Sequence, residues 1–237
     1  MKIEHFGNYD EMSVRAAEIV AREISAKSGK YVLGLPTGST PLGMYAELAR
    51  LAGANKLSFD SVTTFNLDEY YPITRDNPQS YYRFMHDNFF DKIKIDKKRI
   101  NILNGEASDP QFECESYEQK INSVGGIDLM VLGLGANGHI GFNEPGEFLY
   151  PFTHVETLTA NTREMNQRFF SSLFEVPTKA MTMGMASVLR AKKILLLVSG
   201  ETKREAFRIL TDRKITTASP ASFLYTHTNV TILSDLD

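Results

Sequence analysis

The sequence predicts an α/β fold, an open and mostly parallel doubly wound (Rossmann-like) sheet with helices on both faces and a helical lid. Strand and helix signals alternate along the chain, and several strand segments are apolar without alternation, which is typical of strands buried in a parallel sheet. The predicted strands span residues 31–35, 61–65, 100–103, 127–132, 193–198 and 230–233. Amphipathic segments between them predict helices over 11–27, 41–52, 80–93, 109–123 and 201–211.

The 237 residues suit one domain over 1–237, without a linker or repeat to divide it. The net charge of -3 comes from interspersed charges of both signs, so nucleic acid and membrane are poor candidates as partners and the ligand is expected to be small. Cys114 is the only cysteine, which excludes an internal disulfide and a cysteine-cluster metal site. The N-terminus lacks the pattern of a signal peptide and no window is apolar enough to span a membrane, so we expect a cytoplasmic protein.

The first strand ends in a turn, 35–41, that predicts an anion site. Thr40 is a good N-cap and Pro41 suits the first helical turn, which would place the amides of Gly38, Ser39 and Thr40 at a helix N-terminus. The turn lacks the Gly-Lys-Ser/Thr ending of a nucleotide P-loop, so a monophosphate fits it better than a nucleoside triphosphate. An ordinary capped turn is the alternative.

The second strand runs into two adjacent carboxylates, Asp68 and Glu69. Neighbours on an extended segment point in opposite directions, so we expect one carboxylate to face the ligand crevice and the other to bond the scaffold. The position at a strand end favours a catalytic role, and a solvated acidic pair at a turn is the alternative.

The strand 127–132 is followed by the glycine-rich run 133–145, which carries His139 and, five residues later, Glu144. Glu144 could orient the imidazole and support its protonated form, so the run predicts a proton-transfer site. The spacing of glycines also matches a dinucleotide fingerprint, but the residues after His139 contain helix breakers where that fingerprint needs a helix. A purely structural histidine is the other alternative.

Two later segments complete the predicted site. The stretch 155–183 is less regular, and residues 162–170, followed by Pro177, predict the helical lid. The last motif, 198–203, again reads as strand, turn and helix start, with Lys203 in the first helical turn. A lysine there opposes the helix dipole, so Lys203 is better explained by a bound anion, although a solvated surface lysine is an alternative.

Five motifs together closely resemble the glucosamine-6-phosphate deaminase family, in order and over nearly the whole chain. They are LPTGSTP at 35–41, FNLDEY at 65–70, SYYRFMH at 80–86, GLGANGHIGFNEP at 133–145 and SGETK at 199–203. The resemblance implies conversion of glucosamine 6-phosphate and water to fructose 6-phosphate and ammonia, with no cofactor and no metal, on an open α/β sheet.

The resemblance also implies a role for each matching residue. Asp68 would be the general base that moves a proton between C2 and C1 of the open-chain sugar, a task in which a positioned base typically contributes about 100- to 10,000-fold. His139 would open the pyranose ring with Glu144 as its partner. The phosphate would bind to Arg168 in the lid, to Lys203 and to the amides of the first turn.

This chain departs from the family pattern at Asn137, where some members have aspartate. An amide can orient His139 but stabilises its charge less, so the pH profile is where we expect a difference. Regulated members are hexamers activated by N-acetylglucosamine 6-phosphate through basic residues after the Asn-Glu-Pro run, where this chain has Glu147, His154 and Glu156. We therefore expect a short, non-allosteric type, a monomer or small homo-oligomer.

Two other functions share part of this pattern. The motifs are also similar to 6-phosphogluconolactonase, but that family typically has arginine after the Asp-Glu pair, where this chain has Tyr70, and a different run after its Gly-His. A non-catalytic sugar-phosphate sensor could use the same fold, since fold does not determine function. Such a sensor could dispense with Asp68 and His139, both of which are present here.

Overall fold

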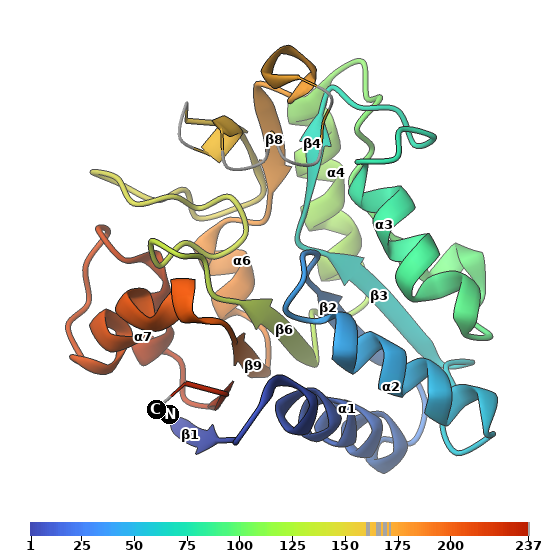
Figure 1. Ribbon diagram of the computed structural model, residues 1–237. Coiled ribbons are helices and arrows are strands. Elements are labelled where there is room, and N and C mark those ends of the chain that lie inside the picture. The colour runs from blue at the N-terminus through green and yellow to red at the C-terminus, as the bar shows by residue number, and fades with distance from the viewer. Residues whose placement is uncertain (160–161, 165–166, 168–169, 171, 237) are drawn as a thin grey trace.

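The computed structural model describes residues 1–159, 162–164, 167, 170 and 172–236. It contains a seven-stranded sheet in the order β1-β10-β9-β6-β2-β3-β5, in which every pairing is parallel (Figure 1). The strands are β1 (Lys2–His5), β2 (Tyr31–Leu35), β3 (Val62–Asn66), β5 (Ile100–Asn101), β6 (Leu129–Gly133), β9 (Lys193–Val198) and β10 (Val230–Ser234). This open, parallel sheet confirms the fold class that the sequence predicts.

The strand order reverses between β2 and β6. From β2 the chain moves outward through β3 to β5, and it then returns to β6 on the other side of β2 before it continues to β9 and β10. The loops after β2 and β6 therefore diverge at the carboxyl end of the sheet. Open α/β sheets bind their ligands in the crevice at such a reversal point.

Helices cover both faces of this sheet and bury a separate core on each. The longer ones are α1 (Tyr9–Ala26), α2 (Leu42–Gly53), α3 (Tyr81–Asn88), α4 (Pro110–Ser123), α6 (Met185–Leu189) and α7 (Arg204–Thr211). One core joins α1, α2 and α3 to residues such as Leu33, and the other joins α4, α6 and α7 to residues such as Val32. Successive strand residues thus enter opposite cores, which explains why these strands read as continuous apolar runs.

A second, three-stranded antiparallel sheet was not predicted from the sequence. It has the order β4-β8-β7, with β4 at Asp68–Tyr71, β7 at His154–Thr157 and β8 at Lys179–Thr182 (Figure 1). The segment 155–183 is thus in part sheet, while the helical lid predicted over 162–170 stays a prediction. Residues 162–164 are helical, but Arg168 and several of its neighbours lie outside the described residues.

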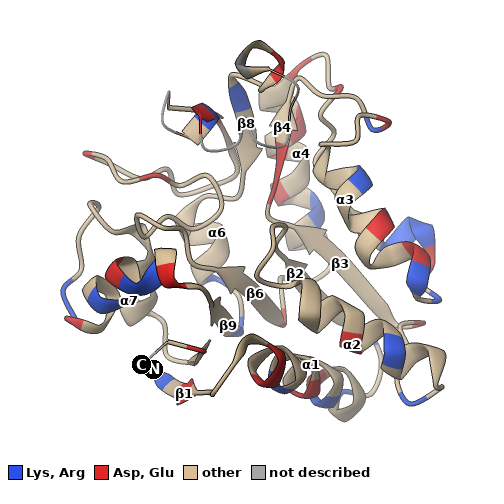
Figure 2. Ribbon diagram, viewed as in Figure 1, with Lys and Arg blue, Asp and Glu red and all other residues tan. Residues whose placement is uncertain are grey.

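Short 3-10 turns connect the larger elements. They are η1 (Phe90–Lys92), η2 (Lys97–Arg99), η4 (Leu173–Glu175), η5 (Glu201–Lys203) and η6 (Pro220–Thr226). Charges of both signs alternate along the outer surfaces of α1 and α7 (Figure 2), where they form pairs such as Arg15 with Glu18 and Arg208 with Glu205. Among the described helices, none has the length and apolarity that a membrane crossing requires.

Candidate active site

A cavity of about 530 Å³ opens at the carboxyl ends of β2 and β6. It lies at the reversal of strand order, and its walls come from the loops after β2 and β6, from β4, from α3 and from η5. Every predicted site residue that the structure describes lines this cavity: Gly38, Ser39, Thr40, Asp68, Asn137, His139, Glu144 and Lys203. Arg168, the remaining one, lies outside the described residues.

The loop after β2 presents free amide groups to the cavity. Gly38 has a φ of +90°, a conformation that favours glycine, and this turns the chain so that it leads into α2. Within the described part of the chain, the amides of Gly38, Ser39 and Thr40 donate no hydrogen bond to another protein group. They are therefore available to an anion near a helix N-terminus, as the sequence suggests.

The predicted cap of this helix is wrong by one residue. Pro41, not Thr40, is the N-cap of α2, because the first helical hydrogen bond runs from the amide of Tyr45 to the carbonyl of Pro41 at 2.9 Å. Tyr9 of α1 supports the turn, since its hydroxyl donates to the carbonyl of Ser39 at 3.1 Å and accepts from the amide of Gly43 at 2.8 Å. Sequence reasoning did not identify this support.

The two carboxylates at the start of β4 point in different directions. Glu69 is 1% exposed and accepts hydrogen bonds from the backbone amides of Tyr70, Tyr81 and Tyr82 at 2.8 to 2.9 Å. It thereby joins β4 to the first turn of α3. Burial raises the pKa of Glu69 to about 7, although these three amides act in the opposite direction.

Asp68 faces the cavity instead. It is 6% exposed, and its Oδ1 atom is buried without a hydrogen-bond partner in the described part of the chain. Burial, together with the neighbouring Glu69 carboxylate, raises the pKa of Asp68 to about 8. A carboxylate with these properties binds protons more strongly than an exposed one, which suits a general base.

Gly141 allows a close approach to Asp68. Its φ is +60°, and a Cβ atom at this position would lie 3.3 Å from Oδ2 of Asp68 and 2.8 Å from Oγ1 of Thr182. The hydroxyl of Thr182 accepts the amide of Phe142 at 3.1 Å, so β8 holds the glycine-rich loop against β4. The loop can lie this close to the carboxylate because residue 141 has no side chain.

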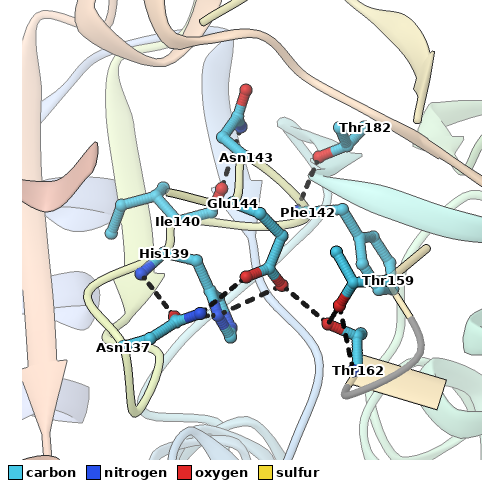
Figure 3. Close-up of polar contacts among 9 residues, drawn as sticks. All are labelled: Asn137, His139, Ile140, Phe142, Asn143, Glu144, Thr159, Thr162 and Thr182. Carbon is cyan, nitrogen blue, oxygen red and sulfur yellow. Dashed lines mark hydrogen bonds and ion pairs between the residues drawn. The ribbon is translucent and has the colours of Figure 1, made fainter. Parts of the chain in front are cut away.

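His139 is connected to Glu144 chiefly through Asn137 (Figure 3). Nδ1 of His139 lies 2.7 Å from Oδ1 of Asn137, and Nδ2 of Asn137 donates to Oε2 of Glu144 at 2.7 Å. A carboxylate can only accept, so the amide nitrogen faces Glu144 and the amide oxygen faces the imidazole. Nδ1 of His139 therefore carries a proton, and Nε2 is the nitrogen left for a ligand in the cavity.

The sequence predicts Glu144 as the partner of His139 and Asn137 as an amide that can orient the imidazole. In the structure, Oδ1 of Asn137 lies 2.7 Å from Nδ1 of His139, and Oε1 of Glu144 lies 3.4 Å from the same atom. Burial alone would raise the pKa of Glu144, but interactions with His139, Asn137 and Thr162 outweigh burial and lower it. Glu144 is thus an anion beside the imidazole.

An aromatic wall adjoins these polar groups. Tyr70, Tyr81, Phe142 and Phe170 all line the cavity, with ring centroids 4.8 Å apart for Tyr70 and Tyr81 and 5.8 Å apart for Tyr70 and Phe170. Apolar rings exclude water and strengthen electrostatic interactions beside them. Sequence reasoning missed this wall, because its members come from β4, from α3 and from two loops and have no common spacing.

Lys203 ends η5, directly before α7, and its side chain is partly exposed at the cavity wall. Asp235, which directly follows β10, holds the turn before η5. The hydroxyl of Ser199 donates to Oδ2 of Asp235 at 2.6 Å, and the amide of Gly200 donates to Oδ1 at 3.3 Å. The cationic side chain and the free amides after β2 thus line one cavity. Together they can bind a phosphate group.

The two other interpretations of the glycine-rich run find no support. Residues 134–147 contain no helix, so the helix that a dinucleotide fingerprint requires is not there. His139 also faces a cavity, which a purely structural histidine has no need to do. Within the described ranges, no cluster of three or more His, Cys, Asp and Glu side chains is placed to hold a metal ion.

Fold and site together define an α/β enzyme that moves protons on a small anionic ligand at the ends of parallel strands. The family of glucosamine-6-phosphate isomerases/6-phosphogluconolactonase matches residues 8–233, and the chain belongs to this family. A glucosamine-6-phosphate deaminase of Thermoanaerobacter pseudethanolicus is 51% identical over 99% of this chain and 92% of its own.

Solved structures agree with this assignment. The structure of a monomeric glucosamine-6-phosphate deaminase is 47% identical, covers 99% of this chain and 97% of its own, and superimposes with a TM-score of 0.95. A 6-phosphogluconolactonase from Thermotoga maritima is 20% identical, with a TM-score of 0.76 over 99% of this chain and 98% of its own. The second likeness shows the shared fold alone.

Proposed function

We propose that this protein converts glucosamine 6-phosphate and water to fructose 6-phosphate and ammonia. The observation that carries the proposal is that one cavity is lined both by the buried Asp68 carboxylate, whose Oδ1 has no hydrogen-bond partner among the described residues, and by the His139 imidazole, which contacts Asn137. The first can take a proton from carbon and the second can exchange protons with ring oxygens. The similar deaminases support the same reaction.

His139 would act first, in opening the ring. Because Nδ1 holds its proton against Asn137, Nε2 would take the proton of the C1 hydroxyl and return a proton to the ring oxygen as the C1–O5 bond breaks. The imidazole is charged in between, and Glu144 would stabilise that charge. The product of this step is the open-chain amino aldehyde.

Asp68 would act on the open chain. It would remove the proton from C2 while the C1 oxygen takes up a proton, giving an enol-type intermediate. It would then return the first proton to C1 while the amino nitrogen gives up a proton. C1 thereby becomes an alcohol and C2 an imine, which water hydrolyses to the ketone and ammonia. The buried position of Asp68 beside the aromatic wall favours this transfer, because a desolvated carboxylate is a stronger base.

The phosphate would be held by other groups on the wall of the same cavity. Lys203 and the amides of Gly38, Ser39 and Thr40 supply charge and hydrogen-bond donors, and Arg168 joins them by family resemblance. Binding the remote phosphate would keep C1 and C2 in register with the two proton-transfer groups.

We also propose that residues 1–237 act as a single deaminase domain, without a cofactor, in the breakdown of amino sugars. A monomer is supported by the monomeric deaminase that this chain resembles. The cytoplasm is the proposed location, since a phosphorylated sugar carries charge and stays in the compartment where it is formed.

A coupled assay for ammonia tests the proposal directly. The purified protein is expected to release ammonia from glucosamine 6-phosphate and to form fructose 6-phosphate in equal amount. Glucosamine without the phosphate should react far more slowly. The proposal fails if no ammonia appears, and hydrolysis of 6-phosphogluconolactone in its place would assign the protein to the other branch of the family.

A further inference from the structure

Glu144 is held at both carboxylate oxygens by donors from two different parts of the chain. Oε2 accepts a hydrogen bond from Nδ2 of Asn137 at 2.7 Å, and Oε1 accepts one from Oγ1 of Thr162 at 3.2 Å. The same Oε1 lies 3.4 Å from Nδ1 of His139 (Figure 3). With a donor on each oxygen, the carboxylate cannot rotate without losing a bond, so Thr162 helps to hold the oxygen that faces the imidazole.

The direction of each hydrogen bond follows from the protons that each group has. A carboxylate only accepts, so Thr162 donates its hydroxyl proton to Glu144. Oγ1 of Thr159 lies 3.0 Å from Oγ1 of Thr162, whose proton is already used, so Thr159 donates in that bond. Oγ1 of Thr159 in turn accepts the amide of Thr162 at 3.1 Å. These bonds form one directed chain from Thr159 through Thr162 to Glu144.

Because residue 137 is an asparagine, these hydrogen bonds to Glu144 affect the charge beside His139. An amide is neutral, so the negative charge that stabilises protonated His139 comes from Glu144 and not from residue 137. That stabilisation depends on the orientation of the Glu144 carboxylate, because charge interactions weaken with distance. In this protein the hydroxyl of Thr162, which comes from the connection between β7 and β8, joins Asn137 as a side-chain donor that holds this orientation.

We propose that Thr162 is a positioning residue for ring opening, whose hydroxyl orients Glu144 and thereby maintains the tautomer and charge of His139. The proposal rests on the proposed function, since ring opening is the step in which His139 exchanges protons. The other ionisable groups on the cavity wall, which every variant below retains, are Asp68, Tyr70, Tyr81 and Lys203.

Three variants test the proposal. Thr162→Val keeps the size of the side chain and removes the hydroxyl, whereas Thr162→Ser keeps the hydroxyl. Thr157→Val is the matched control, because Thr157 is exposed at the end of β7, where the same connection begins, and its hydroxyl has no hydrogen bond within the described residues. Ammonia release from glucosamine 6-phosphate gives kcat and KM across pH, and nitrogen NMR of the imidazole reports the tautomer of His139.

We expect Thr162→Val to lower kcat about 10-fold with little change in KM, because a hydrogen bond to an ionised group is lost while phosphate binding is retained. The hydrogen bond from Thr162 lowers the pKa of Glu144, so its loss should raise that pKa. The acid limb of the kcat profile should therefore move to higher pH. The NMR signals should show a mixture of tautomers. Thr162→Ser and Thr157→Val should stay within about 2-fold of the wild type.

Two results would overturn the proposal: a Thr162→Val protein with unchanged kcat, pH profile and tautomer, or a serine variant as impaired as the valine variant. Failure of the proposed function looks different, because the wild type itself would then release no ammonia. The NMR comparison needs no turnover, so it tests the positioning of His139 in either case.

Discussion

Asp68 and Glu69 are consecutive residues of β4, yet the first carboxylate opens into the cavity without a hydrogen-bond partner among the described residues, while the second accepts three backbone amides of the scaffold. The alternation of side chains along a strand produces this division. β4 thus presents the Asp68 carboxylate to the cavity, while the next residue, Glu69, fixes the strand to α3. Precise placement of a catalytic group depends on such support from the residues around it.

We expect Asp68→Asn to lower kcat by about 100- to 10,000-fold, because it removes a proton acceptor without changing the volume of the side chain. Binding of an unreactive substrate analogue should remain close to that of the wild type. Ammonia release and titration calorimetry measure the two effects.

Glu69→Gln is the control for this prediction. It should reduce the free energy of unfolding by about 1 to 3 kcal/mol, since bonds from backbone amides to a charged acceptor are weakened, while the folded fraction keeps its activity. Near-normal turnover in a folded Asp68→Asn protein would remove Asp68 from the role of base and make Glu69 the nearest candidate.

The raised pKa of Asp68 predicts a dependence of stability on pH. The ordinary value is 3.8 and the folded value is about 8, so between these limits the folded state binds a proton that the unfolded state has lost. The free energy of unfolding should therefore decrease as pH rises through this window, by up to about 1.4 kcal/mol per pH unit. Asp68→Asn cannot lose a proton, so its stability relative to the wild type should increase from pH 4 to above pH 8.

Urea unfolding of both proteins at several pH values measures this difference. The pKa of Glu69 is also raised by burial and acts in the same direction, but Glu69 is present in both proteins, and the comparison isolates Asp68. A difference in stability that stays constant with pH would show that Asp68 is ionised throughout.

Lys203→Ala should raise KM for glucosamine 6-phosphate about 10- to 100-fold, because a charged hydrogen bond to phosphate is lost. Arg168→Ala should raise KM as well and should also lower kcat if its segment closes over the sugar. The check is to repeat both measurements with glucosamine, for which neither substitution should matter. If the wild type showed no preference for the phosphorylated sugar, the phosphate site would be wrongly placed.

The parts of the fold that the sequence predicts well are those set by local patterns. The strands 31–35 and 193–198 have the predicted bounds, because strands that are buried on both faces appear in the sequence as nearly continuous apolar runs. The sheet of β4, β7 and β8 was missed. β4 begins with two acidic residues, and its stability comes from pairings such as Asp68 with Thr182, which are distant in the sequence.

The same distinction applies to the site. Asp68, His139 and Lys203 were each predicted from a motif that directly follows a predicted strand. The bond from Thr162 to Glu144, in contrast, joins two connections that only the folded chain brings together. A Thr-x-x-Thr pair at the start of a predicted helix was the available signal, since Thr159 accepts the amide of Thr162. Nothing in that pair indicates which carboxylate its second hydroxyl meets.

The surface after the Asn-Glu-Pro run predicts kinetics without activation. His154 contacts the carbonyl of Phe152 at 2.9 Å and the carboxylate of Glu156 at 3.3 Å, and Glu147 is exposed nearby in the sequence. The regulated deaminases that this sequence resembles use basic residues in this region to bind N-acetylglucosamine 6-phosphate. Two carboxylates repel a phosphate group, so we expect no second binding site for this phosphate in the region and therefore no bias between two states.

We therefore expect hyperbolic rate curves against glucosamine 6-phosphate and no change on adding N-acetylglucosamine 6-phosphate below concentrations that compete at the active site. Light scattering should give the mass of a monomer under the same conditions. As a positive control, Glu147→Lys combined with Glu156→Lys tests whether charge alone excludes the effector, because these substitutions add two cations to the surface. A sigmoid curve for the wild type that becomes hyperbolic with the acetylated sugar would contradict the prediction and would place an effector site on residues other than these.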